Sequence, residues 1–137
     1  MAYYTIAYTA IVTTGQKMAP KDPEIERYLP LTPPVFHVLL ALADGEKHGY
    51  AILKEVEERT AGRVQLSTGT LYAIFKRLLN DGVIEEIDER PDEDDERRRY
   101  YGLTEFGKQV AVAEAERMED LVASARAKKL VRKPRHV

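Results

Sequence analysis

The amino-acid sequence predicts a mainly α-helical domain that carries a small β-hairpin and ends in one long helix. Three observations support this α+β fold class. Apolar residues recur with helical spacing in three segments between residues 33 and 80. Two short stretches rich in branched and aromatic residues, 83–87 and 99–103, enclose a polar segment, as the strands of a hairpin do. A segment rich in Ala, Glu and Arg then runs without a proline from 104 to about 129.

The N-terminal segment, residues 1–30, differs in composition from the rest and is predicted to be a poorly ordered arm. Tyrosines and threonines lie among small apolar residues, and closely spaced prolines from Pro20 to Pro34 exclude a continuous helix there. Met18 could be an alternative start of translation, in which case residues 1–17 would not belong to the native protein.

The first two helices are predicted after Thr32 and from about His48 to Thr60. Thr32 can cap the first helix, and the two prolines that follow it suit a first helical turn. The pairs Asp44-Gly45 and Ala61-Gly62 are typical helix ends. The predicted inner faces consist of Val35, Val38, Leu39 and Leu42 in the first helix and of Tyr50, Leu53, Val56 and Ile52 in the second.

The third helix is predicted from Ser67 or Thr68 to about Asn80, after a short extended link at 64–66. Either hydroxyl can cap this helix, and Asp81-Gly82 ends it. Its inner face is predicted to consist of Leu71, Ile74, Phe75 and Leu78. The two strands that follow flank the polar segment 88–97, so the hairpin should have an extended tip.

The fourth helix, capped by Thr104, would be about 39 Å long, which exceeds what the small body can cover. Phe106, Val110 and Ala113 are expected to pack back on the body. Further along, apolar residues recur at nearly heptad spacing, the pattern of a helix that pairs with a partner helix. This predicted dimer seam consists of Ala111, Ala115, Met118, Leu121, Val122 and Ala125.

Three helices, a hairpin and a further helix have the layout of a winged helix-turn-helix, which suits double-stranded DNA. In such a fold the N-terminal residues of the third helix approach base edges in the major groove. Here those residues are small, and their hydroxyls and backbone N–H groups can bind phosphate. The candidate DNA-binding residues are Ser67, Thr68, Gly69, Thr70, Tyr72, Lys76 and Arg77 in the helix and Arg97, Arg98 and Arg99 in the wing.

Four sequence blocks resemble the PadR family of bacterial transcriptional regulators. They are LTPPVFHVLLAL from Leu31, HGYAI from His48, STGTLYAIFKRL from Ser67 and RRYYGLTEFGK from Arg98. The resemblance covers about residues 31–129 and implies a homodimeric repressor that dimerises through its C-terminal helix. We therefore expect the DNA target to be a palindromic operator. We also expect the chain to have four parts: the arm 1–30, the winged helix 31–103, the dimerisation helix 104–129 and a basic tail 130–137.

The charge distribution leaves a second hypothesis open, a winged-helix protein-interaction module without DNA binding. The net charge is −2, and the wing tip at 91–96 is acidic where family wings often carry glycine and proline. Basic residues nevertheless gather in separate blocks, 59–80 and 126–137, so one positive face is still expected.

Composition argues against several other classes. The chain has no cysteine, which excludes disulfides, zinc-thiolate sites and cysteine nucleophiles. Its three histidines share no metal-ligand spacing; His37 is predicted to be a partly buried core residue and His48 a helix-start residue, while Tyr50 is either buried or on the DNA side. No metal or cofactor is therefore expected.

The remaining expectations concern activity and location. No nucleophile–base pair or phosphate-binding glycine loop is evident, so an enzyme is not expected. The lack of a long apolar run or a secretory signal favours a soluble cytoplasmic protein without membrane contact. A small-molecule effector could change the spacing between the two DNA-binding heads of a dimer through the C-terminal helices.

Overall fold

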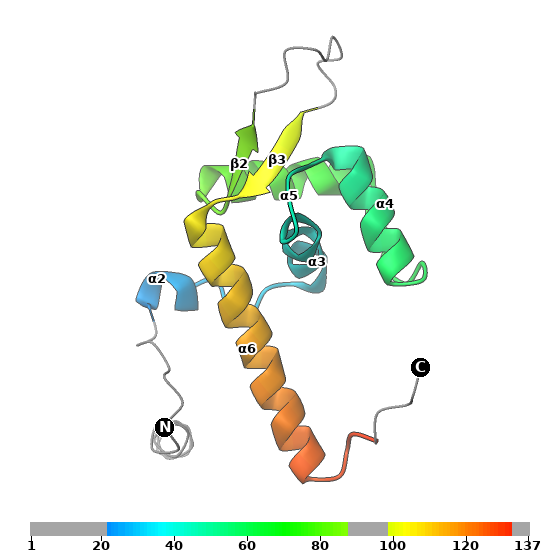
Figure 1. Ribbon diagram of the computed structural model, residues 1–137, viewed down its shortest axis with the longest axis vertical. Helices are drawn as coiled ribbons and strands as arrows, with labels where there is room; N and C mark the ends of the chain where they lie inside the picture. The colour runs from blue at the N-terminus through cyan, green and yellow to red at the C-terminus, as the bar shows by residue number, and fades with distance from the viewer. Residues whose placement is uncertain (1–21, 88–98, 133–137) are drawn as a thin grey trace.

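A computed structural model describes residues 22–87 and 99–132. Figure 1 shows the elements in chain order, and they confirm the predicted arrangement of helices, hairpin and long C-terminal helix. Their bounds are α2 Pro23–Glu26, α3 Pro33–Leu42, β1 Lys47–His48, α4 Gly49–Arg59, α5 Thr68–Asn80, β2 Ile84–Ile87, β3 Tyr100–Leu103 and α6 Glu105–Ala127.

The helices begin where side-chain caps stand in the sequence. The hydroxyls of Thr32, Ser67 and Thr104 each accept the backbone N–H three residues on, at 3.5, 3.0 and 2.9 Å. His48 caps α4, as predicted for a helix-start residue, and its Nδ1 accepts the N–H of Ala51 at 3.2 Å. Each cap satisfies a donor that the helix itself leaves unpaired.

The core lies where α3, α4 and α5 meet the sheet and the first half of α6. The aromatic rings of Phe75 and Tyr101 lie 4.3 Å apart at its centre. The predicted inner faces of α3 and α5 are confirmed, because their apolar residues are buried or packed against the core. The fully or nearly buried members are Val35, Val38, Leu39, Ala41, Leu42, Ile52, Val56, Leu71, Phe75, Leu78, Val83, Ile84, Tyr101 and Val110.

The hairpin belongs to a three-stranded antiparallel sheet in the order β1-β3-β2. In the hairpin Ile84 pairs with Leu103 and Ile87 with Tyr100, while β1 adds the pairs Lys47–Tyr101 and His48–Tyr100. The sequence did not predict β1, because two residues are too few to show the alternation that identifies a strand. The extra strand joins the α3–α4 connection to the base of the wing.

Residues 22–30 differ from the predicted poorly ordered arm. Asp22 caps the short helix α2 through Glu24 N–H at 2.9 Å, and Pro23 supplies its first residue. Ile25 and Tyr28 pack against the core, and the Tyr28 ring meets Phe106 edge-on at 5.8 Å. Proline density excludes a long helix but not a single proline-led turn, and for this reason the prediction was wrong at 22–30. Residues 1–21 lie outside the described part of the chain.

The inner face of α4 also differs from prediction at one position. Ile52 and Val56 are buried and Leu53 packs against the core, but Tyr50 is 70% exposed. Tyr50 lies on the helix face turned away from Ile52, so burial, one of its two interpretations, is wrong.

The start of α6 is held closely against the body. Thr104 Oγ1 donates to the carbonyl oxygens of Gly82 and Val83, at 2.6 and 3.0 Å. Gly107 lies so close to Val83 that a Cβ atom would overlap the Val83 carbonyl oxygen. Beyond this contact Val110 is buried, and the second half of α6 extends away from the body (Figure 1). Within the described ranges, none of the helices combines the length and apolar character that a membrane span requires.

Candidate nucleic-acid interface

The N-terminal turn of α5 forms an exposed polar surface. Ser67, Thr68, Gly69 and Thr70 are all exposed. The Ser67 hydroxyl accepts Thr70 N–H and donates to Thr70 Oγ1 at 2.9 Å, so this pair of hydroxyls is fixed in position. The N–H groups of a first helical turn have no partners within the helix and can bind an anion, aided by the helix dipole. The four residues predicted here therefore share one accessible surface.

Tyr72 lies beside this turn and contacts the start of α4. Its side chain is 44% exposed, and its ring meets Phe75 edge-on at 5.6 Å. A Cβ atom at Gly49 would stand 3.3 Å from the Tyr72 hydroxyl oxygen, so glycine allows this close approach. Tyr72 is thus accessible on one side and supported by the core on the other.

Lys76 and Arg77 are both exposed but lie on different sides of α5. Lys76 follows Tyr72 by one helical turn. Arg77 instead borders an open hollow of about 770 Å³ that is also lined by Tyr28 and Asp81, among others. Burial and then the hydrogen bond to Asp81 raise the pKa of Tyr28, whereas the nearby Arg77 charge opposes that shift. The structure therefore groups Lys76, but not Arg77, with Tyr72.

The wing contributes one described basic residue, Arg99. Its Nε lies 3.4 Å from the Glu86 carboxylate across the hairpin, and its side chain remains largely exposed. The partner that the structure describes for Arg99 therefore lies on β2. Arg97 and Arg98 lie outside the described residues, as does the tip.

An aromatic group at the base of the wing was not predicted as a unit. The His48 ring stacks against Tyr50 at 6.5 Å and meets Tyr100 edge-on at 5.6 Å. This arrangement depends on the pairing of β1 with β3, which brings His48 opposite Tyr100. The exposed Tyr50 belongs to this group, which agrees with the surface interpretation of that residue.

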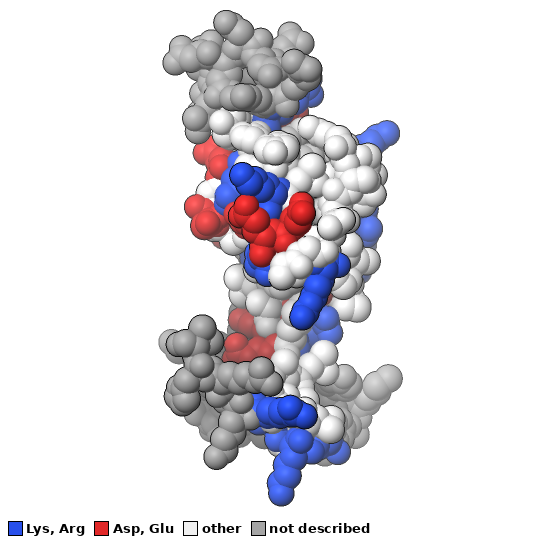
Figure 2. Space-filling model, turned by 90° about the vertical axis from the view of Figure 1, so that its right-hand side faces the viewer, with Lys and Arg blue, Asp and Glu red and all other residues white. Residues whose placement is uncertain are grey.

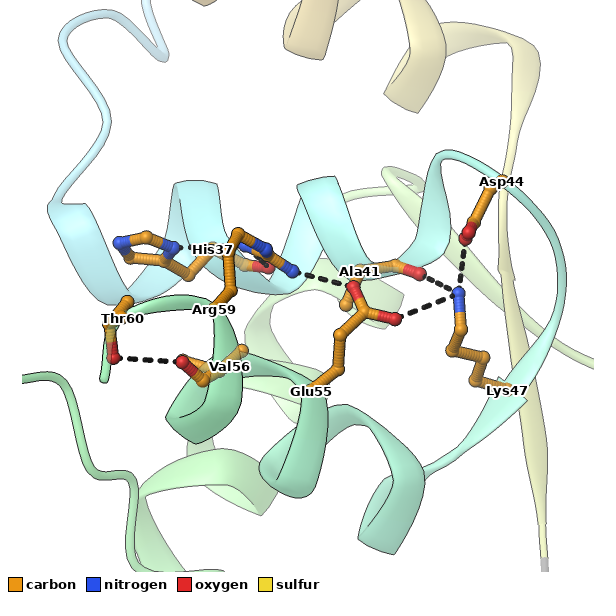
Figure 3. A network of polar contacts seen from close by, with 8 residues as sticks. All are labelled: His37, Ala41, Asp44, Lys47, Glu55, Val56, Arg59 and Thr60. Carbon is orange, nitrogen blue, oxygen red and sulfur yellow. Dashed lines mark hydrogen bonds and ion pairs between the residues drawn. The ribbon is translucent and has the colours of Figure 1, made fainter. Parts of the chain in front are cut away.

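A network of polar contacts fixes α4 against α3 (Figure 3). Arg59 lies 3.0 Å from His37 Nδ1 and 2.6 Å from Glu55, while Lys47 bonds Asp44, Glu55 and the Ala41 carbonyl. His37 is partly buried, as predicted, and burial and the Arg59 charge lower its pKa. The network holds together the two helices that precede α5 in the chain.

The opposite charges in this network reinforce one another. Burial opposes the charge of Lys47, but hydrogen bonds to Asp44 and Glu55 outweigh it and raise the Lys47 pKa. The hydrogen bond between Lys47 and Asp44 also lowers the pKa of Asp44. None of these carboxylates forms part of a metal site, since residues 22–87 and 99–132 contain no cluster of three or more potential metal ligands.

The predicted dimer seam runs along α6 from Ala111 to Ala125. Ala111 packs against the core of its own chain, so it lies at the inner edge of the seam. Met118 and Ala125 are half-buried, whereas Ala115, Leu121 and Val122 are exposed. On a helical projection the face that contains Val110 continues into Leu121 and Ala125. This face passes through the ion pair of Glu114 and Arg117 and becomes apolar again beyond the body that covers its first half.

Leu130 is an exposed apolar residue directly after α6 that was not among the predicted seam residues. After α6, Lys129 adopts a φ of 61°, and Leu130 N–H bonds Ala125 O at 2.9 Å. This is the Schellman arrangement, which turns an apolar residue back toward the last helical turn. Leu130 is 76% exposed. An apolar residue one position after a C-terminal Lys pair is the signal that could have predicted its place.

The exposed polar start of α5 and the adjacent hairpin define a protein of the winged-helix class. Within that class the chain belongs to the transcriptional regulator PadR-like family, whose model matches residues 38–113. This is a family of transcription regulators and not of enzymes.

Two curated relatives have been described only as uncharacterised proteins. One, from Lysinibacillus sphaericus, is 35% identical over 71 residues, which are 52% of this chain and 64% of the relative. The other, from a transposon of Streptomyces fradiae, is 38% identical over 84 residues, 61% of this chain and 22% of the relative. The chain thus spans less than two thirds of either relative.

Solved structures of transcriptional regulators share the fold. A regulator from Clostridium thermocellum is 26% identical with a TM-score of 0.57, over 81% of this chain and all of that chain (100%). A PadR family regulator from Clostridium difficile is 25% identical with a TM-score of 0.59, over 68% of this chain and 94% of that chain.

Proposed function

We propose that the chain is a homodimeric, sequence-specific DNA-binding repressor whose helix α5 reads the major groove. The observation that carries this proposal is the exposed N-terminal turn of α5, where small polar residues from Ser67 to Thr70 leave the helix start accessible. Helix N-termini with small residues can approach base edges and phosphates closely.

The charge of α5 supports DNA as the partner. The helix contains no Asp or Glu, and Lys76 follows Tyr72 on its accessible side. In this proposal Lys76 binds a phosphate, and the hydroxyls of Thr68 and Thr70 reach the major groove. The wing, about residues 88–99 with Arg99, contacts the backbone or the minor groove. Arg77 stays in the proposed set as a flanking phosphate contact.

The apolar face of α6 supports a homodimer. A second copy of the helix would cover Met118, Leu121 and Val122, which the body of the same chain leaves accessible. Related by two-fold symmetry, the two copies of α5 would enter successive major grooves, about 34–36 Å apart. A palindromic operator follows from that symmetry. An effector that changed the angle between the body and α6 would change this spacing.

The experiment that tests DNA binding combines selection and salt dependence. Bound duplexes are selected from a random pool with the full chain, and affinity for the selected sequence is then measured from low to high salt. We expect a steep negative slope of log affinity against log salt, because each phosphate contact releases a counterion. Lys76→Ala should make that slope shallower by about one unit per released ion, whereas Lys108→Ala, an exposed lysine on α6, should not change it.

The alternative, a protein-interaction module, is favoured by acidic residues on the surface around α4. Glu57 and Glu58 are exposed on this helix, and the face in Figure 2 carries acidic and basic side chains together rather than one positive surface. Such a module would show no enrichment of any sequence and no salt-dependent DNA binding. Enrichment of one palindrome by the full chain excludes it.

A further inference from the structure

Glu114 on α6 is a charged side chain with no exposed surface (0%). It is the one buried charged residue in the described part of the chain. Its Oε2 accepts the backbone N–H of Leu31 at 2.6 Å, and its Oε1 accepts the Nε–H of Arg117. Burying a carboxylate is costly unless it is paired and hydrogen-bonded, so both contacts are needed to keep Glu114 in place.

The partner of Glu114, Leu31, lies 83 residues away in sequence and two residues before the start of α3. Near its start α6 is already held at Gly107 against Val83. Gly107 and Glu114 are separated by about 10 Å along the helix axis. Two anchors fix the direction of a rigid helix, whereas the first anchor alone would leave a pivot.

The chemistry of the second anchor suits it to fixing an angle. Apolar contacts such as those of Val110 are non-directional and tolerate sliding. A hydrogen bond to a backbone N–H is directional and defines where the helix passes. Beyond Glu114, the segment 115–127 continues away from the body for about 20 Å (Figure 1). A tilt of about 10° at the anchor would move its far end by about 3.5 Å, close to the rise of one base pair.

We propose that Glu114 is a positioning residue for DNA recognition. By tying α6 to Leu31, in the segment that leads into α3, it sets the angle between the winged-helix body and the dimerisation helix. That angle determines the distance and rotation between the two α5 helices of the dimer, and hence the half-site spacing that the dimer accepts. This inference rests on the proposed function, but its first test does not require DNA.

The first test measures the distance between the two bodies of the dimer. Because the chain has no cysteine, Glu58→Cys on the exposed surface of α4 allows one spin label per protomer. We expect a narrow distance distribution in the labelled parent and one at least about twofold wider in Glu114→Leu and Glu114→Ala, whose helices can tilt. Glu114→Gln, with an amide oxygen that can accept the Leu31 N–H, should restore most of the narrow distribution. The matched control, Glu116→Ala on the exposed side of α6, should not change it.

The second test measures spacing preference. Palindromes are built from the selected half-site with the spacer changed by one and two base pairs. The parent should lose affinity steeply, whereas Glu114→Leu should bind all spacings within about threefold, with its affinity for a single half-site unchanged. A merely structural role would lower every affinity alike.

The outcomes of the two tests are distinct. An unchanged distance distribution in Glu114→Leu and Glu114→Ala overturns the proposal, and so does an unchanged spacing preference in Glu114→Leu. If neither variant folds, Glu114 is a folding residue and the proposal is also overturned. If the parent binds no DNA, the proposed function fails, and the spin-label distances alone decide whether Glu114 sets the angle.

Discussion

Gly107 offers a direct test of how closely α6 is packed on the body. In Gly107→Ala the new Cβ would overlap the Val83 carbonyl oxygen and lie 3.0 Å from its carbonyl carbon, below the 3.4–4 Å of ordinary contact. The obstacle is backbone at the end of the α5–β2 connection, so no side chain can rotate away. The helix must therefore shift outward or the variant must unfold.

The expected loss of stability follows from three contributions. Overpacking of this kind costs about 3 kcal/mol, the upper part of the usual range, because backbone must move. An outward shift also weakens the bonds of Thr104 N–H and Oγ1 to Val83 O, each worth about 1 kcal/mol. Alanine recovers roughly 1 kcal/mol of helix propensity. The net loss is about 3–4 kcal/mol, which lowers Tm by about 10–13 °C in a domain of this size.

The assay is urea unfolding followed by circular dichroism, with Gly69→Ala as the control. Gly69 is also helical, but its added Cβ would meet only Ser67 Oγ, at 4.0 Å. That variant should be as stable as the parent or slightly more so. If Gly107→Ala has the same midpoint of urea unfolding as the parent, the close packing of α6 on Val83 is refuted.

Four further predictions address the seam, the site, pH and the arm. Met118→Glu or Val122→Glu should give monomers in sedimentation, because a charge would be desolvated at the seam; a dimer at low micromolar concentration places the seam elsewhere. Tyr72→Phe should weaken operator binding by about 1 kcal/mol per protomer if its hydroxyl binds phosphate, and unchanged binding with an unchanged melt excludes that contact. Because the pKa of His37 is lowered on folding, the stability it contributes is present above about pH 6.5 and is lost as pH falls through the folded pKa, so the advantage of the parent over His37→Gln should shrink in acid. Deletion of residues 1–17 should leave Tm and DNA affinity nearly unchanged, and a large drop in Tm would show that the arm is structural.

Local signals explain why so much of the fold could be predicted. The starts of α3, α5 and α6 coincide with Thr32, Ser67 and Thr104, since a cap acts on N–H groups two or three residues away. Helical periodicity likewise identified Leu71 and Phe75 as core residues, because an inner face repeats within one helix.

Contacts between distant segments could not be predicted in the same way. Nothing in the residues around Glu114 indicates that its carboxylate meets Leu31 N–H, and only the assembled fold brings them together. Arg77 shows the same limit within the candidate site, since its position beside Tyr28 depends on where α2 packs. Tyr50 was ambiguous because α4 is short and apolar residues occupy more than one of its faces.

The long-range pairing of this small domain has a consequence for its synthesis. The pairing of β1 with β3 can form only after Tyr101 has been synthesised. The hydrogen bond of Leu31 N–H likewise requires Glu114. At about 5–20 residues per second, α3 to α5 leave the ribosome several seconds before their partners. Chains cut short before α6 therefore lack Val110 in their core as well as the second anchor. Such fragments should be degraded by proteases; under the proposed function this would keep isolated winged-helix bodies from occupying half an operator.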